Sequence, residues 1–198
     1  MDIVLYVHGM GGNADEAEHY KPLFPSCEVI GLDYMSTTPW DAGEEISQTV
    51  RRMSTRCKRI YLVANSIGAF FCMNADIGKY IDHAWFISPV VDMEKLITGM
   101  INLAGVTESE LEKKQTIRTD FGEELSWEYL CYVRRHPVEW DVPTDILYGS
   151  KDNLTSIKTI TDFSAAHNAR LTVMENGEHW FHTEQQMLFL DNWIKNDQ

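Results

Sequence analysis

A serine at the end of an apolar run is the first residue of this chain that could do covalent chemistry. Ser66 follows the run 59–65 and stands in the sequence Ala-Asn-Ser-Ile-Gly, residues 64–68. This pattern approximates the G-x-S-x-G elbow, in which small neighbours let a nucleophilic serine occupy a strained turn between a strand and a helix. The first amide of that helix, from Ile67, would then stabilise a developing oxyanion. The alternative is an ordinary serine that caps the helix.

A glycine-rich loop follows the first apolar run of the chain. Residues 8–12 read His-Gly-Met-Gly-Gly, and backbone amides in such a loop can point into a site. In an acyl-transfer site, the amide of Met10 is the best candidate for a second oxyanion donor. A phosphate-binding loop is disfavoured because neither G-x-x-x-x-G-K-[ST] nor G-x-G-x-x-G occurs here. A plain glycine turn is the other alternative.

Two aspartates lie near the ends of a later apolar run, residues 144–150. Asp152 comes just past its end, where catalytic groups gather in open α/β sheets. A carboxylate there could hold a histidine in one tautomer, although a turn or cap aspartate is the local alternative. Asp145 is the weaker candidate, because it lies at the start of the run and therefore at the opposite edge of the sheet.

Two histidines follow the last apolar run, residues 169–177. His179 comes first and follows a glycine, so its loop can fold back over the sheet. It could accept the proton of Ser66 with one ring nitrogen while Asp152 orients the other. His182 is the second candidate, but it stands next to Thr183, which begins the last helix.

Six apolar runs and the segments between them must position these residues. Strands are predicted at 3–9, 27–34, 59–66, 84–91, 144–150 and 169–177. Several of these runs are apolar on successive residues, which is typical of parallel strands that are covered on both faces. The intervening segments have helical spacing. One face of 40–57 carries Ile46, Val50 and Met53, one face of 156–168 carries Ile157, Ile160 and Phe163, and the last helix carries Met187, Leu190 and Ile194 after a Thr183–Gln186 capping box. Alternation of strands and helices predicts an α/β fold with a doubly wound, mostly parallel sheet in one domain, residues 1–198.

One segment breaks this alternation. Residues 93–142 contain no convincing strand, and they are far longer than the usual connection of about 2–6 residues. Met93, Leu96, Ile97, Met100 and Ile101 share one helical face, and Leu125, Tyr129, Leu130 and Val133 share another. We therefore predict a helical cap insertion at 93–142. The alternative is one more helix that packs on the sheet, followed by an irregular loop.

Charge and cysteine content narrow the classes of partner and location. The net charge is −13, from 17 basic and 30 acidic residues, and such a surface repels nucleic acid and anionic membranes. The four cysteines are scattered without metal-ligand spacing, so neither a zinc site nor a disulfide framework is expected. The N-terminal residues lack the basic and apolar regions of a signal peptide. These features favour a cytoplasmic protein with reduced thiols.

Taken together, the motifs HGMGG, ANSIGAF, YGSKD and GEHWFH occur in an order that resembles the α/β-hydrolase fold family over nearly the whole chain. The resemblance implies a compact, six-stranded member with Ser66 as nucleophile, His179 as general base and then acid, and Asp152 as orienting acid. It also implies that Met10 and Ile67 supply the oxyanion amides. The sequence departs from the family at Ala64, where the elbow usually has glycine, and in lacking the first two strands.

The expected activity is hydrolysis of a small carboxylic ester or thioester through an acyl-enzyme, with no metal or organic cofactor. Two alternatives stay open. The same triad could cleave a C–C bond or a small peptide, because the fold does not determine the substrate. The scaffold could also serve as a non-catalytic ligand-binding module.

Overall fold

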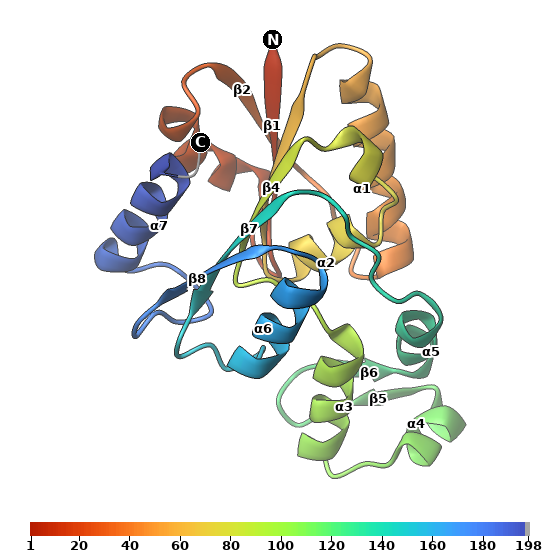
Figure 1. Ribbon diagram of the computed structural model, residues 1–198. Helices are drawn as coiled ribbons and strands as arrows, with labels where there is room; N and C mark the ends of the chain where they lie inside the picture. Colours follow the sequence, from red (N-terminus) through yellow and green to blue (C-terminus); the bar gives the residue numbers. More distant parts are fainter. Residues whose placement is uncertain (197–198) are drawn as a thin grey trace. The chain divides into compact units, whose positions relative to one another are not determined.

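A six-stranded parallel sheet forms the centre of the protein, in a computed structural model that describes residues 1–196 (Figure 1). The strand order is β2-β1-β3-β4-β7-β8, and every neighbouring pair is parallel. The strands are β1 (Asp2–Val7), β2 (Cys27–Leu32), β3 (Ile60–Asn65), β4 (His83–Ile87), β7 (Thr144–Gly149) and β8 (Arg170–Met174). Each of the six predicted runs is a strand, so the prediction of a doubly wound parallel sheet is confirmed.

Helices cover both faces of this sheet. They are the 3-10 helix η1 (Ala14–Leu23), α1 (Pro39–Ser54), α2 (Ile67–Met73), the short η2 (Gly78–Tyr80), α6 (Ile157–Ala166) and α7 (Glu184–Asn196). Figure 1 shows α7 and α1 on opposite sides of the sheet. Side chains of η1 and α7 pack with Tyr6, Trp85 and Met174 in one buried cluster, and α1 and α2 contact each other and β3. Successive side chains of a strand point to opposite faces of the sheet, so they pack alternately against these two helical layers.

Most of the predicted helical faces are buried as expected. Ile46, Val50 and Met53 of α1 are at most 4% exposed. The capping box of α7 is present, because Thr183 Oγ1 accepts from the amide of Gln186 and the Gln186 side chain accepts from the amide of Thr183.

The prediction for Ile157 is wrong, because this side chain is 51% exposed. At 3.6 residues per turn, Ile157 lies about 120° from Phe163 around α6. The buried face is centred on Ile160 and Phe163, and it does not reach that far.

Residues 92–138 form a second compact unit, which we describe by itself. It contains α3 (Met93–Leu103), α4 (Glu108–Lys114), β5 (Thr116–Arg118), β6 (Glu124–Ser126) and α5 (Trp127–Arg135). The expectation of a purely helical segment is wrong here, because β5 and β6 pair as an antiparallel hairpin. Strands of three residues are too short to show a period in the sequence.

Residues 139–142 belong to the unit that contains the sheet, so the predicted insertion is slightly too long. Trp140 is 2% exposed, its ring lies 5.5 Å from that of Phe86, and it donates to Thr144. The role of the segment as a cap stays a prediction.

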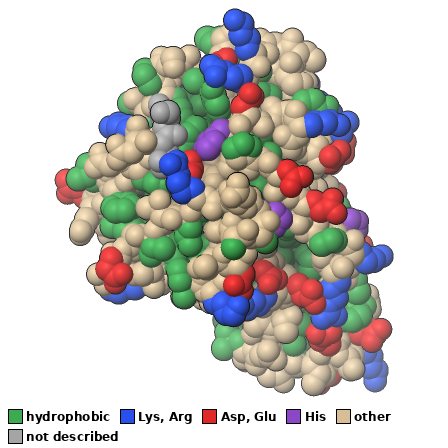
Figure 2. All heavy atoms as spheres, in the orientation of Figure 1, with side chains coloured by type: hydrophobic (Ala, Val, Ile, Leu, Met, Phe, Trp, Pro, Cys, Tyr) green, Lys and Arg blue, Asp and Glu red, His purple; other side chains and the backbone are tan. Residues whose placement is uncertain are grey.

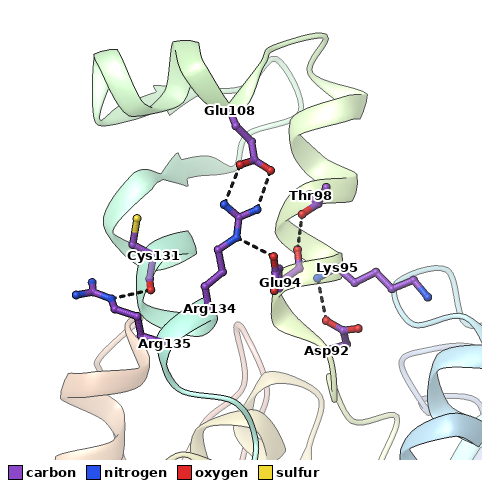
Figure 3. A network of polar contacts seen from close by, with 8 residues as sticks. All are labelled: Asp92, Glu94, Lys95, Thr98, Glu108, Cys131, Arg134 and Arg135. Atoms are coloured by element: carbon purple, nitrogen blue, oxygen red, sulfur yellow. Dashed lines mark hydrogen bonds and ion pairs between the residues drawn. The ribbon is translucent and has the colours of Figure 1, made fainter.

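Arg134 holds the three helices of the second unit together (Figure 3). Its guanidinium on α5 donates two hydrogen bonds of 2.8 Å to both oxygens of Glu108 on α4 and one of 2.7 Å to Glu94 on α3. The hydrogen bonds from Arg134 lower the pKa of Glu108. A carboxylate with a lowered pKa stabilises the fold above its ordinary pKa and loses that contribution as the pH falls through the lowered value.

We expect Arg134→Met to loosen residues 92–138 without unfolding the sheet. Because these groups are more than a third exposed, the loss should be only about 1 kcal/mol. Amide hydrogen exchange should therefore become several-fold faster in residues 92–138 at pH 7, and the difference from wild type should shrink in acid and high salt. Arg135→Met is the matched control, because the one hydrogen bond of the Arg135 side chain among residues 1–196 goes to the carbonyl of Cys131 on its own helix. Equal exchange in Arg134→Met and wild type would contradict this role.

Acidic and basic side chains are interspersed on the face of the molecule that Figure 2 shows. Within residues 1–196, no helix is long and apolar enough to cross a membrane.

Candidate active site

Ser66 occupies a strained turn between β3 and α2. Its φ of 50° and ψ of −120° lie in a region that residues other than glycine rarely adopt. The turn is held from both sides, since the Ser66 amide donates to the carbonyl of Ile87 at 3.0 Å and its carbonyl accepts from Val90 at 3.1 Å. The Ser66 side chain makes no capping hydrogen bond to α2. The geometry therefore differs from that of an ordinary helix cap, in which the side chain accepts from an amide of the first turn.

Small residues are required around this turn. A Cβ at Gly68 would lie 2.3 Å from the carbonyl oxygen of His8, so no larger residue fits there without moving the backbone. A Cβ at Gly9 would lie 3.2 Å from the Cβ of Ser66. Ala64 is fully buried within β3. The elbow thus tolerates alanine at its first position but requires glycine at its last.

His179 and Asp152 extend from Ser66 in one hydrogen-bonded line. Ser66 Oγ lies 2.8 Å from His179 Nε2, and His179 Nδ1 lies 2.7 Å from Asp152 Oδ2. The Asp152 side chain is fully buried and that of His179 is 15% exposed. Both residues follow the carboxyl ends of their strands, β7 and β8, as the sequence predicts. The structure therefore brings these three predicted residues together, although they are far apart in the chain.

The hydrogen bonds around Asp152 determine which tautomer of His179 fits. Asp152 Oδ1 accepts from the amides of Leu154 at 2.8 Å and Thr155 at 3.0 Å. Its Oδ2 faces His179 Nδ1, and an ionised carboxylate can only accept. The proton of neutral His179 is therefore on Nδ1, which leaves the lone pair of Nε2 facing the hydroxyl of Ser66. This is the arrangement that a general base for Ser66 requires.

The two weaker candidates lie elsewhere, as expected. Asp145 is the second residue of β7, and its carboxylate accepts from His83 at 2.8 Å and from Arg170. It lies beside a hollow of about 460 Å³ at the amino edge of the sheet. Burial opposes ionisation of Asp145, but the hydrogen bonds from His83 and Arg170 lower its pKa. His182 donates from Nδ1 to the carbonyl of Trp180 and stacks on the Trp180 ring. Neither residue belongs to the line that ends at Ser66.

The glycine loop after β1 lies against Ser66 through Gly9. The Tyr34 hydroxyl donates to the carbonyl of His8 at 2.8 Å, and the amide of Gly12 donates to the carbonyl of Gly9 at 3.2 Å. Gly11 has a φ of +74°, a conformation that favours glycine. Within residues 1–196, no oxygen accepts a hydrogen bond from the amide of Met10. Ile67 is the first residue of α2, where amides lack an intrahelical acceptor.

The sequence and the structure were compared with those of known proteins. No protein-family model and no curated protein matches the sequence. Solved structures match strongly. Est1E from Butyrivibrio proteoclasticus is 17% identical with a TM-score of 0.74, over 99% of this chain and 86% of that one. A putative hydrolase from Agrobacterium vitis S4 is 16% identical with a TM-score of 0.78, over 98% and 87%. Alpha/beta hydrolase domain-containing protein 10 from mouse is 15% identical with a TM-score of 0.72, over 98% and 88%.

The chain has the α/β-hydrolase fold. Its strand order and the position of Ser66 after the third strand of the chain place the nucleophile candidate near the middle of the sheet. In an α/β-hydrolase fold, the carboxyl edge of the parallel strands is where ligands bind. Ser66, Asp152 and His179 all lie at this edge, because each follows the end of a strand.

Sequence reasoning missed two side chains of this α/β-hydrolase fold that lie against the glycine loop, Tyr34 and Glu16. The ring of Tyr34 stacks at 4.3 Å on His8, which is buried. Glu16 reaches the loop as part of a capping box with Asn13. The Asn-x-x-Glu spacing of that box is visible in the sequence and could have predicted the start of η1. Among residues 1–196, no group of three or more His, Cys, Asp or Glu side chains is arranged to hold a metal ion.

Proposed function

We propose that the protein is a serine hydrolase that cleaves a small carboxylic ester or thioester. The observation that carries the proposal is the line from Ser66 Oγ through His179 to the buried Asp152, with contacts of 2.8 and 2.7 Å. The strained backbone of Ser66 supports it, because backbone conformations of this kind cluster at active sites.

Acylation would begin with attack of Ser66 Oγ on the carbonyl carbon of the ester. His179 Nε2 takes the hydroxyl proton as the new C–O bond forms, and the carbonyl electrons move onto the oxygen. The resulting imidazolium is stabilised by the carboxylate of Asp152. When the tetrahedral intermediate collapses, the bond to the leaving alcohol or thiol breaks, and His179 returns the proton to that group.

Deacylation would repeat these steps with water in place of Ser66. His179 removes a proton from water as the water oxygen attacks the acyl carbon. When the second intermediate collapses, the bond to Ser66 Oγ breaks, His179 returns the proton to that oxygen, and the carboxylic acid is released. In both steps, the amides of Met10 and Ile67 would donate to the oxyanion. One donor of this kind contributes about 3–4 kcal/mol to the transition state.

The comparisons support an ester substrate only by analogy. Est1E has also been solved with ferulic acid bound, and a carboxylic acid is the product expected of an esterase. Cleavage of a C–C bond or a small peptide by the same triad is the alternative, since fold alone does not specify the reaction. A non-catalytic binding module is the other alternative, and it would not require an activated serine.

Labelling with a fluorophosphonate, followed by mass spectrometry of the modified peptide, tests whether Ser66 is activated. We expect one adduct, on Ser66, because His179 increases the nucleophilicity of that hydroxyl only. The adduct should be lost in His179→Ala and retained in His182→Ala. A folded protein with no adduct on Ser66 would contradict the proposal and favour the binding module. If Ser66 is labelled, a panel of ester, thioester and peptide substrates would identify the bond that is cleaved.

A further inference from the structure

A chain of hydrogen bonds connects the residue before Ser66 with the glycine loop after β1. Asn65 Nδ2 donates to the hydroxyl of Tyr6 at 2.9 Å, and that hydroxyl donates to Glu16 Oε2. Glu16 Oε1 accepts from the amide of Asn13 at 3.3 Å. This series of hydrogen bonds thus begins at the end of β3, beside Ser66, and ends at Asn13, directly after the loop that contains Met10.

Tyr6 is the fixed centre of this chain. It is 1% exposed and stacks on Tyr20 at 4.9 Å. Burial, then the neighbouring Tyr20, then the hydrogen bond to Glu16 raise the pKa of Tyr6 far above its usual value. The phenol therefore stays protonated and donates a hydrogen bond to the Glu16 carboxylate. The buried Oδ1 of Asn65 has no partner within the described residues, and the Nδ2 group of this amide is held at the Tyr6 hydroxyl.

Glu16 lies directly against the loop. A Cβ at Gly12 would lie 2.7 Å from Glu16 Oε1, so the carboxylate fills the space beside that glycine. Side chains from outside the loop thereby hold it at its two ends, Tyr34 at His8 and Glu16 at Asn13, the residue that directly follows the loop. Met10 lies between these points, with its side chain 68% exposed and its amide unbonded among the described residues.

We propose that Glu16, held by Tyr6, is a positioning residue that fixes the amide of Met10 for the oxyanion. This inference rests on the proposed hydrolase function. A donor stabilises the transition state most when it is already in place before the charge develops. Because the oxyanion forms only after attack, loss of Glu16 should lower kcat and leave KM nearly unchanged.

Three variants test the proposal with p-nitrophenyl acetate as substrate. In Glu16→Ala, kcat per fluorophosphonate-titrated serine should fall roughly 10–100-fold, which is less than the 10²–10³-fold cost of removing an oxyanion donor outright. Glu16→Gln keeps one acceptor oxygen and the same length, so it should recover to within about 5-fold of wild type. Glu18→Ala is the matched control from the same helix, because Lys21 is the single side-chain partner of Glu18 within the described part of the chain, and this variant should equal wild type.

Hydrogen exchange at the amides of residues 9–13 gives a readout that does not depend on activity. Exchange there should be faster in Glu16→Ala, near normal in Glu16→Gln and unchanged in Glu18→Ala. Wild-type kcat per titrated serine in Glu16→Ala, or unchanged exchange in the loop, would overturn the positioning role. A wild-type protein that neither labels at Ser66 nor turns over ester would overturn the hydrolase function itself.

Discussion

Replacement of Ser66 by alanine should lower kcat for ester hydrolysis by about 10⁶-fold, because the acyl-enzyme can no longer form. The fold should survive. Alanine and serine meet the same backbone strain at a φ of 50°, and the lost hydrogen bond to His179 contributes only about 1 kcal/mol. Steady-state kinetics and the midpoint of thermal unfolding, measured on the same preparation, check both parts of the expectation.

Ser88 supplies the control for this experiment. It also follows a strand, has a φ of 44° and is 1% exposed, but its hydroxyl has no hydrogen-bond partner within the described residues. Ser88→Ala should therefore keep kcat within about 3-fold of wild type, because no hydrogen bond is lost. If Ser66→Ala kept more than about 1% of wild-type kcat, the observed turnover would not proceed through an acyl-Ser66 intermediate.

Replacement of Asp152 by asparagine should lower kcat by about 10⁴-fold while the side chain keeps its shape. The amides of Leu154 and Thr155 both donate to Oδ1, so the carbonyl oxygen of the new asparagine must face them. Its NH₂ group then faces His179 Nδ1, which has to become the acceptor. The ring proton moves to Nε2, and the base can no longer accept the proton of Ser66. The rate of fluorophosphonate labelling should fall in parallel with kcat.

A buried aspartate within β7, Asp145, is the matched control for this change. Asp145 also pairs with a histidine, His83, but at the other end of the strand. Asp145→Asn should lower the free energy of unfolding, because Arg170 and His83 lose a charged partner. It should leave kcat per titrated serine unchanged. Equal losses of kcat in Asp145→Asn and Asp152→Asn would show that the effect arises from stability and not from the tautomer of His179.

Much of the site was predictable because its residues directly follow strands. Ser66, Asp152 and His179 each come one to five residues after a strand that is apolar on successive positions, and parallel strands bring their ends to one edge. From the sequence motif, a strained backbone at Ser66 could be expected, but not its dihedral angles. Its actual φ depends on the hydrogen bonds with Ile87 and Val90, which the sequence does not show.

Contacts that span long stretches of sequence were not predictable. Glu16 meets Tyr6 across ten residues, and Asn65 meets Tyr6 across 59. The capping spacing marks the start of η1, but nothing in it indicates which strand residue the carboxylate will reach. The hairpin of β5 and β6 was missed for a different reason, since only Leu125 of its six residues is buried. Such short strands leave no periodic signal.

The separation between Ser66 and His179, 113 residues along the chain, has a consequence for the order of folding. During synthesis, β1 to β4 and the strained turn emerge well before β7 and β8, which bring the acid and the base. Contacts of such long range form late, because the entropy of closing a large loop opposes them. Recovery of Ser66 labelling during refolding should therefore lag behind the formation of helical structure. Labelling of Ser66 would then show that the last strand, β8, has joined the sheet.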